Sequence, residues 1–371
     1  MKSMTVVIRT DASTEIGTGH VMRCLTLANN LKQQAINVEF ICRGTEGNLI
    51  SLIEGQGYKV YCLNNKEFSE KENLFINNYE QKSNISIEKD YEETIVRLKQ
   101  FLDSIDLLIV DHYELDMRWE EKVKKYVKKI MVIDDLANRK HSCDLLLDQN
   151  LYDVSSKPYK DLVPEYCLTL IGPKYSLLRQ DFLKYRIRKN KTLKDLSILV
   201  FFGGSDEHNE TSKVLHAIKE LNLPNVHFHI VVGSSNKNKE RIKVICSEME
   251  NADYYCQINN MAQLMSKCDL ALGAGGSTSW ERCCLGLPSV IVSMASNQKD
   301  LSLKLSEVGA VKYLGDFNNV DIEIWKRNIK EYLGNESLRE EMTRISTSLV
   351  DGLGANRVTE IIVKQLIMKK E

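Results

Sequence analysis

The sequence predicts an α/β protein made of two similar halves, with parallel sheets that face a central cleft. Short apolar runs alternate with amphipathic helical stretches along the 371 residues. This alternation predicts parallel strands joined by right-handed helical crossovers. The alternation restarts near residue 196, and a chain of this length exceeds most single cores. We therefore expect an N-terminal domain over 1–185 and a C-terminal domain over 186–371.

The first half is expected to contain six strands and three helices. The strands are the apolar runs at 5–11, 37–43, 59–63, 106–113, 129–135 and 143–150. The helices are the amphipathic stretches at 20–34, 46–57 and 118–127. Parallel sheets place binding residues at the carboxyl ends of their strands, so the residues that follow these runs are candidates for a site.

Two intervals lack this periodicity. Residues 64–92 are rich in Asn, Glu and Lys, and we expect a mobile surface insertion there, with a lid over the cleft as the alternative. Residues 151–195 hold three prolines and the basic run "KYRIRKNKTLK". We expect this basic run to be a solvated linker, and a phosphate site is the alternative.

The second half repeats the pattern of the first. Strands that run into turns are expected at 195–206, 226–235, 253–260, 269–281, 287–293 and 310–316, with helices between them. The tail after residue 315 ends in the helical stretch "ANRVTEIIVKQLIMKK", which is expected to pack across the domains.

Composition excludes several classes of function. The net charge is −1, which argues against nucleic-acid binding through bulk electrostatics. No apolar run approaches the roughly 18 residues of a membrane span, and the start "MKSMTVVIRT" lacks the apolar core of a signal peptide. The ten cysteines form no C-x-x-C pair, so we expect free thiols in a cytoplasmic protein, without a zinc site or other cofactor.

Three glycine turns follow predicted strands, and each is expected to open a helix whose free amides favour an anion. They are Gly17-Thr18-Gly19, Gly203-Gly204-Ser205 and the run from Gly273 to Thr278. The third is the strongest, because its amides and hydroxyls can hold a diphosphate while Glu281 accepts from both ribose hydroxyls. The chain lacks a G-x-x-x-x-G-K-[ST] motif, and Met22 replaces the third glycine of a dinucleotide fingerprint.

His20 follows the first turn directly, where it can act as a proton acceptor or as an ordinary residue at the start of a helix. Asp111, His112 and Tyr113 end one strand, and some of them must point toward the same cleft. Carboxylates also follow the next two strands, at Asp134-Asp135 and at Asp148, which is followed by Asn150. These acids could bind a metal, or they could orient histidines and cap helices.

These motifs together resemble a known family. The segments "IRTDASTEIGTGHVMRCLTLA", "IVDHYELD", "DDLANRKHSCDLLLDQN", "FFGGSD" and "LGAGGSTSWERCCLGLPSVIVSMASNQ" resemble the UDP-2,4-diacetamido-2,4,6-trideoxy-β-L-altropyranose hydrolases of pseudaminic acid biosynthesis. The resemblance spans residues 4 to 315 and implies a GT-B-like architecture of two Rossmann-like domains, related to the UDP-N-acetylglucosamine transferase of peptidoglycan synthesis. It also implies a role in the modification of flagellin or surface glycans.

The family pattern implies roles for individual residues. His20 corresponds to the catalytic base, and Tyr113, the second residue expected to be catalytic, lines the sugar side of the cleft. The insertion at 64–92 and the tail depart from the shorter members and put fine substrate specificity in doubt. The residues expected to bind the UDP-linked sugar are Gly17, Gly19, Asn150, Gly204, Ser205, Ile258, Met261, Gly275, Gly276, Ser277, Thr278, Glu281, Asn297 and Gln298.

The implied reaction is hydrolysis at the anomeric carbon with inversion, giving UDP and the free sugar. His20 would take a proton from water, and the glycine turns would hold the departing diphosphate without a metal. A glycosyltransferase with the same cleft and a non-catalytic nucleotide-sugar binding protein are the alternatives. No nucleic-acid or membrane partner is expected, and the sequence leaves the oligomeric state open.

Overall fold

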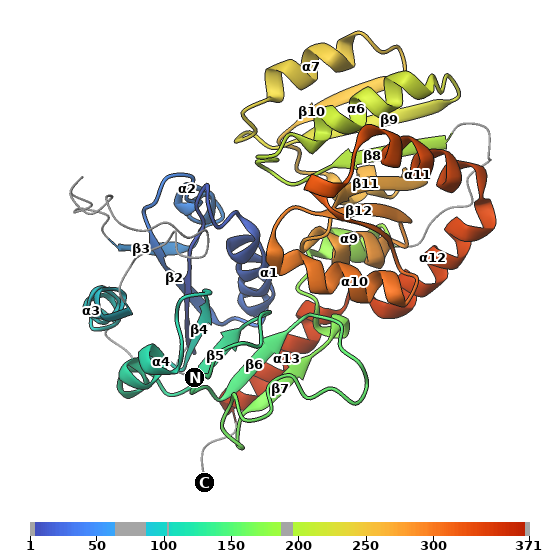
Figure 1. Ribbon diagram of the computed structural model, residues 1–371. Coiled ribbons are helices and arrows are strands. Elements are labelled where there is room, and N and C mark those ends of the chain that lie inside the picture. The colour runs from blue at the N-terminus through green and yellow to red at the C-terminus, as the bar shows by residue number, and fades with distance from the viewer. Residues whose placement is uncertain (1–3, 64–86, 102–103, 187–195, 368–371) are drawn as a thin grey trace. The chain divides into compact units, whose positions relative to one another are not determined.

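The computed structural model describes residues 4–63, 87–101, 104–186 and 196–367, and these form two compact units (Figure 1). Unit 1 takes in the described parts of Met1–Asp148, Val154–Ile171 and Asn356–Glu371. Unit 2 takes in Gln149–Asp153 and the described part of Gly172–Ala355. Each unit contains one parallel sheet, as the alternation of apolar runs and helices predicts.

Unit 1 has a seven-stranded sheet in the order β3-β2-β1-β4-β5-β6-β7. Every residue of the central strand β1 is buried, which is typical of a parallel strand covered on both faces. The strands are β1 (Thr5–Thr10), β2 (Asn37–Arg43), β3 (Lys59–Leu63), β4 (Leu107–Asp111), β5 (Ile130–Ile133), β6 (Leu145–Asp148) and β7 (Leu168–Ile171). The helices are α1 (Gly19–Gln33), α2 (Ile50–Gly55), α3 (Ile87–Leu98), α4 (Met117–Val123) and α13 (Gly354–Ile367), of which α13 starts in unit 2.

Unit 2 has a six-stranded sheet in the order β10-β9-β8-β11-β12-β13. Its strands are β8 (Leu196–Phe201), β9 (Val226–Val232), β10 (Ala252–Cys256), β11 (Leu270–Ala274), β12 (Ser289–Ser293) and β13 (Lys312–Asp316). Its helices are α5 (Gln180–Lys184), α6 (Glu210–Leu221), α7 (Lys239–Ser247), α8 (Met261–Met265), α9 (Thr278–Leu285), α10 (Lys299–Glu307), α11 (Ile322–Gly334) and α12 (Glu336–Leu349).

Two apolar cores cover the two faces of the unit 2 sheet. Ile198 and Val200 of β8 belong to the core that includes residues of α6, α7 and α11. Leu199, between them, belongs to the core that includes residues of α8 and α9. This division follows from the strand geometry, because successive side chains point to opposite faces of a sheet.

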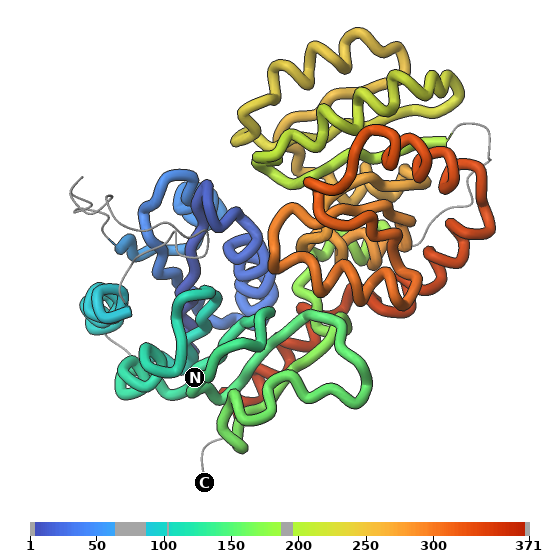
Figure 2. Tube along the Cα trace, in the orientation of Figure 1, coloured from blue at the N-terminus to red at the C-terminus, as the bar shows by residue number. Residues whose placement is uncertain are grey.

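The last described helix, α13, joins the two units in sequence. Residues from Asn356 onward count with unit 1, and Figure 2 traces them as the red segment at the end of the described chain. There the Lys129 ammonium before β5 donates to the Gln365 carbonyl oxygen at 2.6 Å and to its side-chain oxygen at 2.9 Å. None of the helices in the described residues has the length and apolar character to cross a membrane.

The division between the units differs from the boundary expected at 185 and 186. Leu178 and Phe182, which the sequence places in the first domain, are buried in the apolar core of unit 2 with residues of α8 and α9. The strand β7 is also absent from the predicted elements. It is a short edge strand of four residues whose first two are exposed, so it lacks the buried apolar run of central strands such as β1 and β4.

The interval at 64–92 needs a partial correction. Residues 64–86 lie outside the described residues, but Ile87–Leu98 form α3. Its Asp90 is 3% exposed and pairs with buried arginines, so this end of the interval is part of the fold and not a surface insertion. Most of the basic run also lies outside the described residues.

Candidate functional site

His20 lies at the start of α1, directly after the first glycine turn. Gly17 has a φ of +77°, a conformation that glycine adopts without strain, and a Cβ built on it would meet open space. Thr18 precedes the helix without capping it through its side chain. The turn therefore delivers His20 to the carboxyl end of β1, as the sequence predicts.

One nitrogen of His20 is held by a buried carboxylate. Its Nδ1 lies 2.6 Å from Oδ1 of Asp111, at the end of the neighbouring strand β4. Burial alone would raise the pKa of Asp111, but Arg23 and His20 lower it well below its ordinary value. Because Asp111 is ionised, it accepts a hydrogen bond from Nδ1–H, so Nε2 is the nitrogen that remains for another partner. No described residue provides a hydrogen-bond partner for Nε2.

Arg23 completes this arrangement, and the sequence analysis missed it. Its Nε donates to Oδ2 of Asp111 at 2.7 Å, and a terminal nitrogen donates to Oδ1 at 2.7 Å. Its other terminal nitrogen reaches Asp135 at 2.9 Å. Arg23 stands three residues after His20 on α1, so helical spacing brings both side chains to one carboxylate. The arginine fixes Asp111, which in turn fixes the imidazole.

Tyr113 packs against the imidazole of His20. The ring centroids are 4.5 Å apart with planes at 82°, an edge-to-face arrangement. Tyr113 therefore lies beside His20, which unites the two residues expected to be catalytic.

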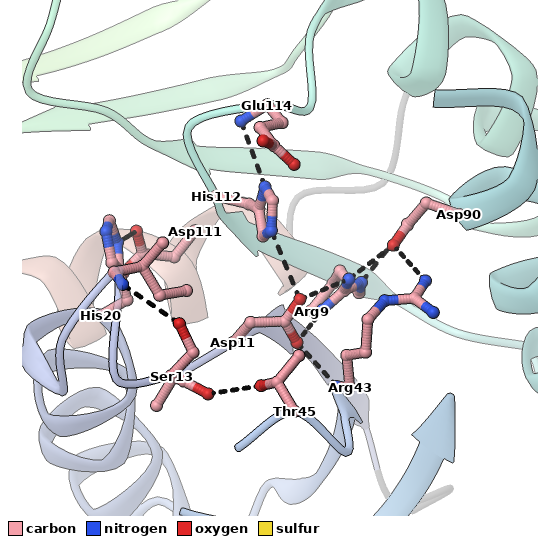
Figure 3. Close-up of polar contacts among 12 residues, drawn as sticks. Arg9, Asp11, Ser13, His20, Arg43, Thr45, Asp90, Asp111, His112 and Glu114 are labelled. Carbon is pink, nitrogen blue, oxygen red and sulfur yellow. Dashed lines mark hydrogen bonds and ion pairs between the residues drawn. The ribbon is translucent and has the colours of Figure 1, made fainter. Parts of the chain in front are cut away.

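A second buried network lies beside His20 at the same sheet edge (Figure 3). The guanidinium of Arg9 contacts Asp11 at 2.5 and 2.8 Å and Asp90 at 2.6 Å. Arg43 of β2 contacts Asp90 at 2.9 Å, and Nε2 of His112 lies 3.3 Å from Asp11. These contacts tie α3 to the ends of β1, β2 and β4, and they place His112 in the network around Asp11.

The acids after β5 and β6 make contacts within the protein. The hydroxyl of Tyr159 lies 2.8 Å from Asp134 and 2.9 Å from Asp148. Asp134 also pairs with Arg139 at 2.9 Å. These carboxylates hold the side chains of Tyr159 and Arg139.

In unit 2 the third glycine turn opens α9. The helix begins at Thr278, and the Ser277 hydroxyl makes no capping hydrogen bond. Ser277 is exposed, and Thr278 and Gly276 are half-buried. An uncapped helix start carries free amides and the positive end of the helix dipole, which together attract anions.

Two neighbouring side chains leave no room for a side chain at Gly275 and little room at Gly276. A Cβ on Gly275 would lie 2.0 Å from the Ser302 hydroxyl, and one on Gly276 would lie 3.3 Å from Nε2 of Gln298. Gln298 is itself fixed, because its Oε1 accepts from the Met294 amide at 3.0 Å. The turn thus brings together Gly275, Gly276 and Gln298, as expected for one binding region.

Glu281 and Arg282, in the first turns of α9, are charged groups that form no ion pair within the described residues, although each lies close enough to affect the pKa of the other. Glu281 is half-buried and makes no hydrogen bond or ion pair with the described residues. Burial raises the pKa of Glu281 to about 7, against the lowering effect of Arg179 and Arg282. Arg282 is buried, donates to the Ala274 carbonyl and to Ser279, and has no carboxylate within ion-pair distance in the described chain. Burial lowers the pKa of Arg282 to about 10.

The turn after β8 differs from its prediction. Gly203 has a φ of +97°, but α6 begins only at Glu210, so this turn does not open a helix directly. Asp206 instead caps α6 by accepting from the amides of Glu210 and Thr211 at 2.9 and 3.0 Å. Gly204 and the half-buried Ser205 lie in the intervening turn.

The remaining predicted residues lie mostly in unit 2. Met261 begins α8, and both Met261 and Ile258 pack in one apolar cluster with Trp280 of α9. Asn297 is exposed, next to Gln298. Asn150 follows β6 but counts with unit 2. His20, Tyr113, Gly17 and Gly19 belong to unit 1, and the other predicted binding residues belong to unit 2.

Known proteins resemble this chain in sequence and in fold. Residues 198–353 match the glycosyltransferase family 28 C-terminal domain. The UDP-2,4-diacetamido-2,4,6-trideoxy-beta-L-altropyranose hydrolase of Campylobacter jejuni is 28% identical over 307 residues, which are 82% of this chain and 97% of that protein. The resemblance to these hydrolases is confirmed.

Two further comparisons extend this result. An uncharacterized protein of Methanocaldococcus jannaschii is 27% identical over 80% of this chain, which spans only 57% of that relative's length. The crystal structure of MurG from Acinetobacter baumannii superposes with a TM-score of 0.68 at 16% identity, covering 98% of this chain and 99% of MurG. The fold is accordingly GT-B-like, with the two parallel sheets that the sequence predicts.

Proposed function

We propose that the protein hydrolyses a UDP-linked sugar, UDP-2,4-diacetamido-2,4,6-trideoxy-β-L-altropyranose, by attack of water at the anomeric carbon C1. The observation that carries the proposal is the position of His20. Its Nδ1 lies 2.6 Å from the carboxylate of Asp111, which leaves Nε2 as the ring nitrogen that faces the reaction. The similarity to the Campylobacter jejuni hydrolase supports this substrate.

In this mechanism Nε2 of His20 removes a proton from water as the water oxygen bonds to C1. The bond between C1 and the diphosphate oxygen breaks, and its electron pair leaves with UDP. Attack on the face opposite the leaving group inverts the configuration at C1. Arg23 holds Asp111, and Asp111 stabilises the imidazolium that forms on His20. The ring of Tyr113 packs against the imidazole and restricts its orientation.

Unit 2 would hold the UDP portion of the same molecule. The uncapped start of α9 and the buried charge of Arg282 would stabilise the negative charge that develops on the diphosphate. Glu281 would accept from the ribose hydroxyls, and Ile258 and Met261 would pack on uracil. Gly204 and Ser205 would contact the diphosphate, and Asn150, Asn297 and Gln298 would make polar contacts to sugar or ribose.

The deciding experiment is hydrolysis of the UDP-linked altrose-type sugar in oxygen-18 water, followed by mass spectrometry of both products. We expect the label in the free sugar, because water attacks carbon. Label in UDP would show attack at phosphorus and would overturn the role given to His20. Absence of any release would overturn hydrolysis itself.

A second candidate function is glycosyl transfer, which the match to a glycosyltransferase domain favours. In that reaction an acceptor hydroxyl would replace water at C1. Turnover measured with and without added sugar acceptors separates the two reactions. Hydrolysis proceeds at full rate without an acceptor, whereas a transferase needs one.

A further inference from the structure

Two histidines and a carboxylate lie together on one face of the unit 2 sheet, away from the glycine turns. His227 and His229 alternate along β9, so both side chains point to the same face. Asp253 of the edge strand β10 is the register partner of His229. His227 is the second residue of β9, and the turns of the candidate nucleotide site follow the opposite, carboxyl ends of the strands.

The donor atoms of these three residues converge. Oδ2 of Asp253 lies 2.9 Å from Nε2 of His227 and 3.5 Å from Nδ1 of His229. All three donor atoms lie within 4.8 Å of one another. Ligands about 2.0–2.1 Å from a tetrahedral zinc ion are roughly 3.3 Å apart. Two of the three separations therefore already match a shared ion, and a small rotation of one imidazole closes the third.

The cluster is anchored on one side and open on the other. The side chain of His229 is 13% exposed, while those of His227 and Asp253 are 38% and 50% exposed. The Tyr255 hydroxyl lies 3.1 Å from Asp253 and 3.3 Å from Nδ1 of His229. A metal ion can therefore reach the cluster from solvent, and water can supply its remaining ligand.

We propose that His227, His229 and Asp253 bind a divalent transition-metal ion of the zinc class. Two imidazoles and one carboxylate suit such ions, and they do not suit magnesium or calcium, which prefer oxygen ligands. Without metal, His227 and Asp253 pair directly, and the bound ion takes the place of the proton between them. The ion joins β10 to β9, so it stabilises the edge of the sheet. This site is independent of the proposed hydrolysis.

The test is isothermal titration of the full chain with Zn²⁺, together with Co²⁺ as a spectroscopic probe of imidazole ligation. We expect one ion per chain, and at saturating metal a rise in Tm of roughly 5 °C. His227→Ala is the principal variant, because an exposed side chain is removed without disturbing the core. It should weaken binding by about 100-fold or more and abolish the rise in Tm.

The matched control is His216→Ala on α6, which removes a histidine bonded to the Ser212 carbonyl in its own helix. That variant should bind metal as the unmodified protein does. The proposal is overturned if the unmodified chain binds no zinc, or if His227→Ala and Asp253→Asn both bind it with unchanged affinity. Circular dichroism of each variant establishes that it is folded before titration.

Discussion

The two sheets differ in whether the charged side chains at their carboxyl edges form ion pairs. In unit 1 the carboxylates of Asp111, Asp11 and Asp90 each contact an arginine, and burial is compensated by opposite charge. In unit 2 Glu281 and Arg282 form no ion pair among the described residues, burial outweighs the effect of nearby arginines on the pKa of Glu281, and the start of α9 has no side-chain cap. A charge that is already paired is fixed in place, whereas an unpaired buried group is costly until something binds to it.

The comparison assigns different tasks to the two edges. Unit 1 fixes the orientation of one imidazole, which is what a reaction step requires. Unit 2 leaves hydrogen-bond donors and acceptors without partners, and a bound ligand can supply those partners. Substitutions in unit 1 should therefore change turnover, and substitutions in unit 2 should change nucleotide affinity.

The largest expected effect is that of His20→Ala. Loss of a general base lowers turnover by about 10²–10⁴-fold, whereas UDP affinity should stay nearly unchanged because the nucleotide residues belong to unit 2. UDP release and UDP binding are measured on the same preparation, with His216→Ala as the control. Loss of UDP affinity in the His20 variant would contradict the assignment of turnover to unit 1 and of nucleotide binding to unit 2.

Asp111→Asn should lower turnover on the order of 10²-fold, because the amide no longer holds Nδ1–H of His20. It should also reduce the free energy of unfolding by about 3 kcal/mol, since Arg23 loses its main buried partner. Asp116→Asn is the matched control, because Asp116 caps α4 and pairs only with the exposed Arg118. Turnover of the Asp111 variant equal to that of the control would contradict the positioning role.

Glu281 should make nucleoside affinity depend on pH. With a pKa of about 7, this carboxyl changes from mostly protonated to mostly ionised between pH 6 and 8, and only the ionised form accepts from both ribose hydroxyls. Uridine affinity should therefore rise by up to about tenfold over this range. Uridine is the suitable ligand because it has no phosphate that titrates nearby.

Glu281→Gln should remove this pH dependence. It should also stabilise the ligand-free protein at pH 8. A raised folded-state pKa means that stability is lost as pH rises from about 4.5 to about 7, and the neutral amide avoids that loss. An unchanged slope of uridine affinity with pH in this variant would show that another group titrates.

The smallest effect should come from Ser277→Ala at the start of α9. Because the hydroxyl caps nothing, the free energy of unfolding should change by less than about 0.5 kcal/mol, against about 1 kcal/mol for an ordinary cap. Asp321→Ala supplies the comparison, since Asp321 caps α11 by accepting from the Ile324 amide at 2.8 Å. Equal losses in chemical denaturation would mean that Ser277 does cap its helix.

Local sequence patterns predict much of this fold and part of the site. Short runs of parallel-strand length locate each strand of the described residues except β7, and glycine after a strand locates His20 at the start of α1. The partners of His20 depend on pairings across the chain that local patterns do not encode. The sequence marks Asp111 only as an acid at a strand end, because its contact with His20 spans 91 positions.

The sequence contains two further local signals, one for Arg23 and one for α3. Arg23 follows His20 by three residues, a spacing that places both on one face of a helix. Ile87, Tyr91 and Ile95 recur at intervals of four, which predicts α3 within an interval otherwise too polar to suggest a helix. The burial of Asp90 had no local signal, because it depends on Arg9 at a separation of 81 residues.

The return of α13 to unit 1 has a consequence for synthesis. Unit 2 consists almost wholly of the single stretch from Gly172 to Ala355, so the ribosome releases it before residues 356–367. Domains generally fold as units in the order in which they emerge. Unit 1 emerges first, but its residues from 356 onward emerge only after unit 2 has been synthesised. Until they emerge, Lys129 lacks its contact with Gln365. Unit 1 is therefore begun first and completed last.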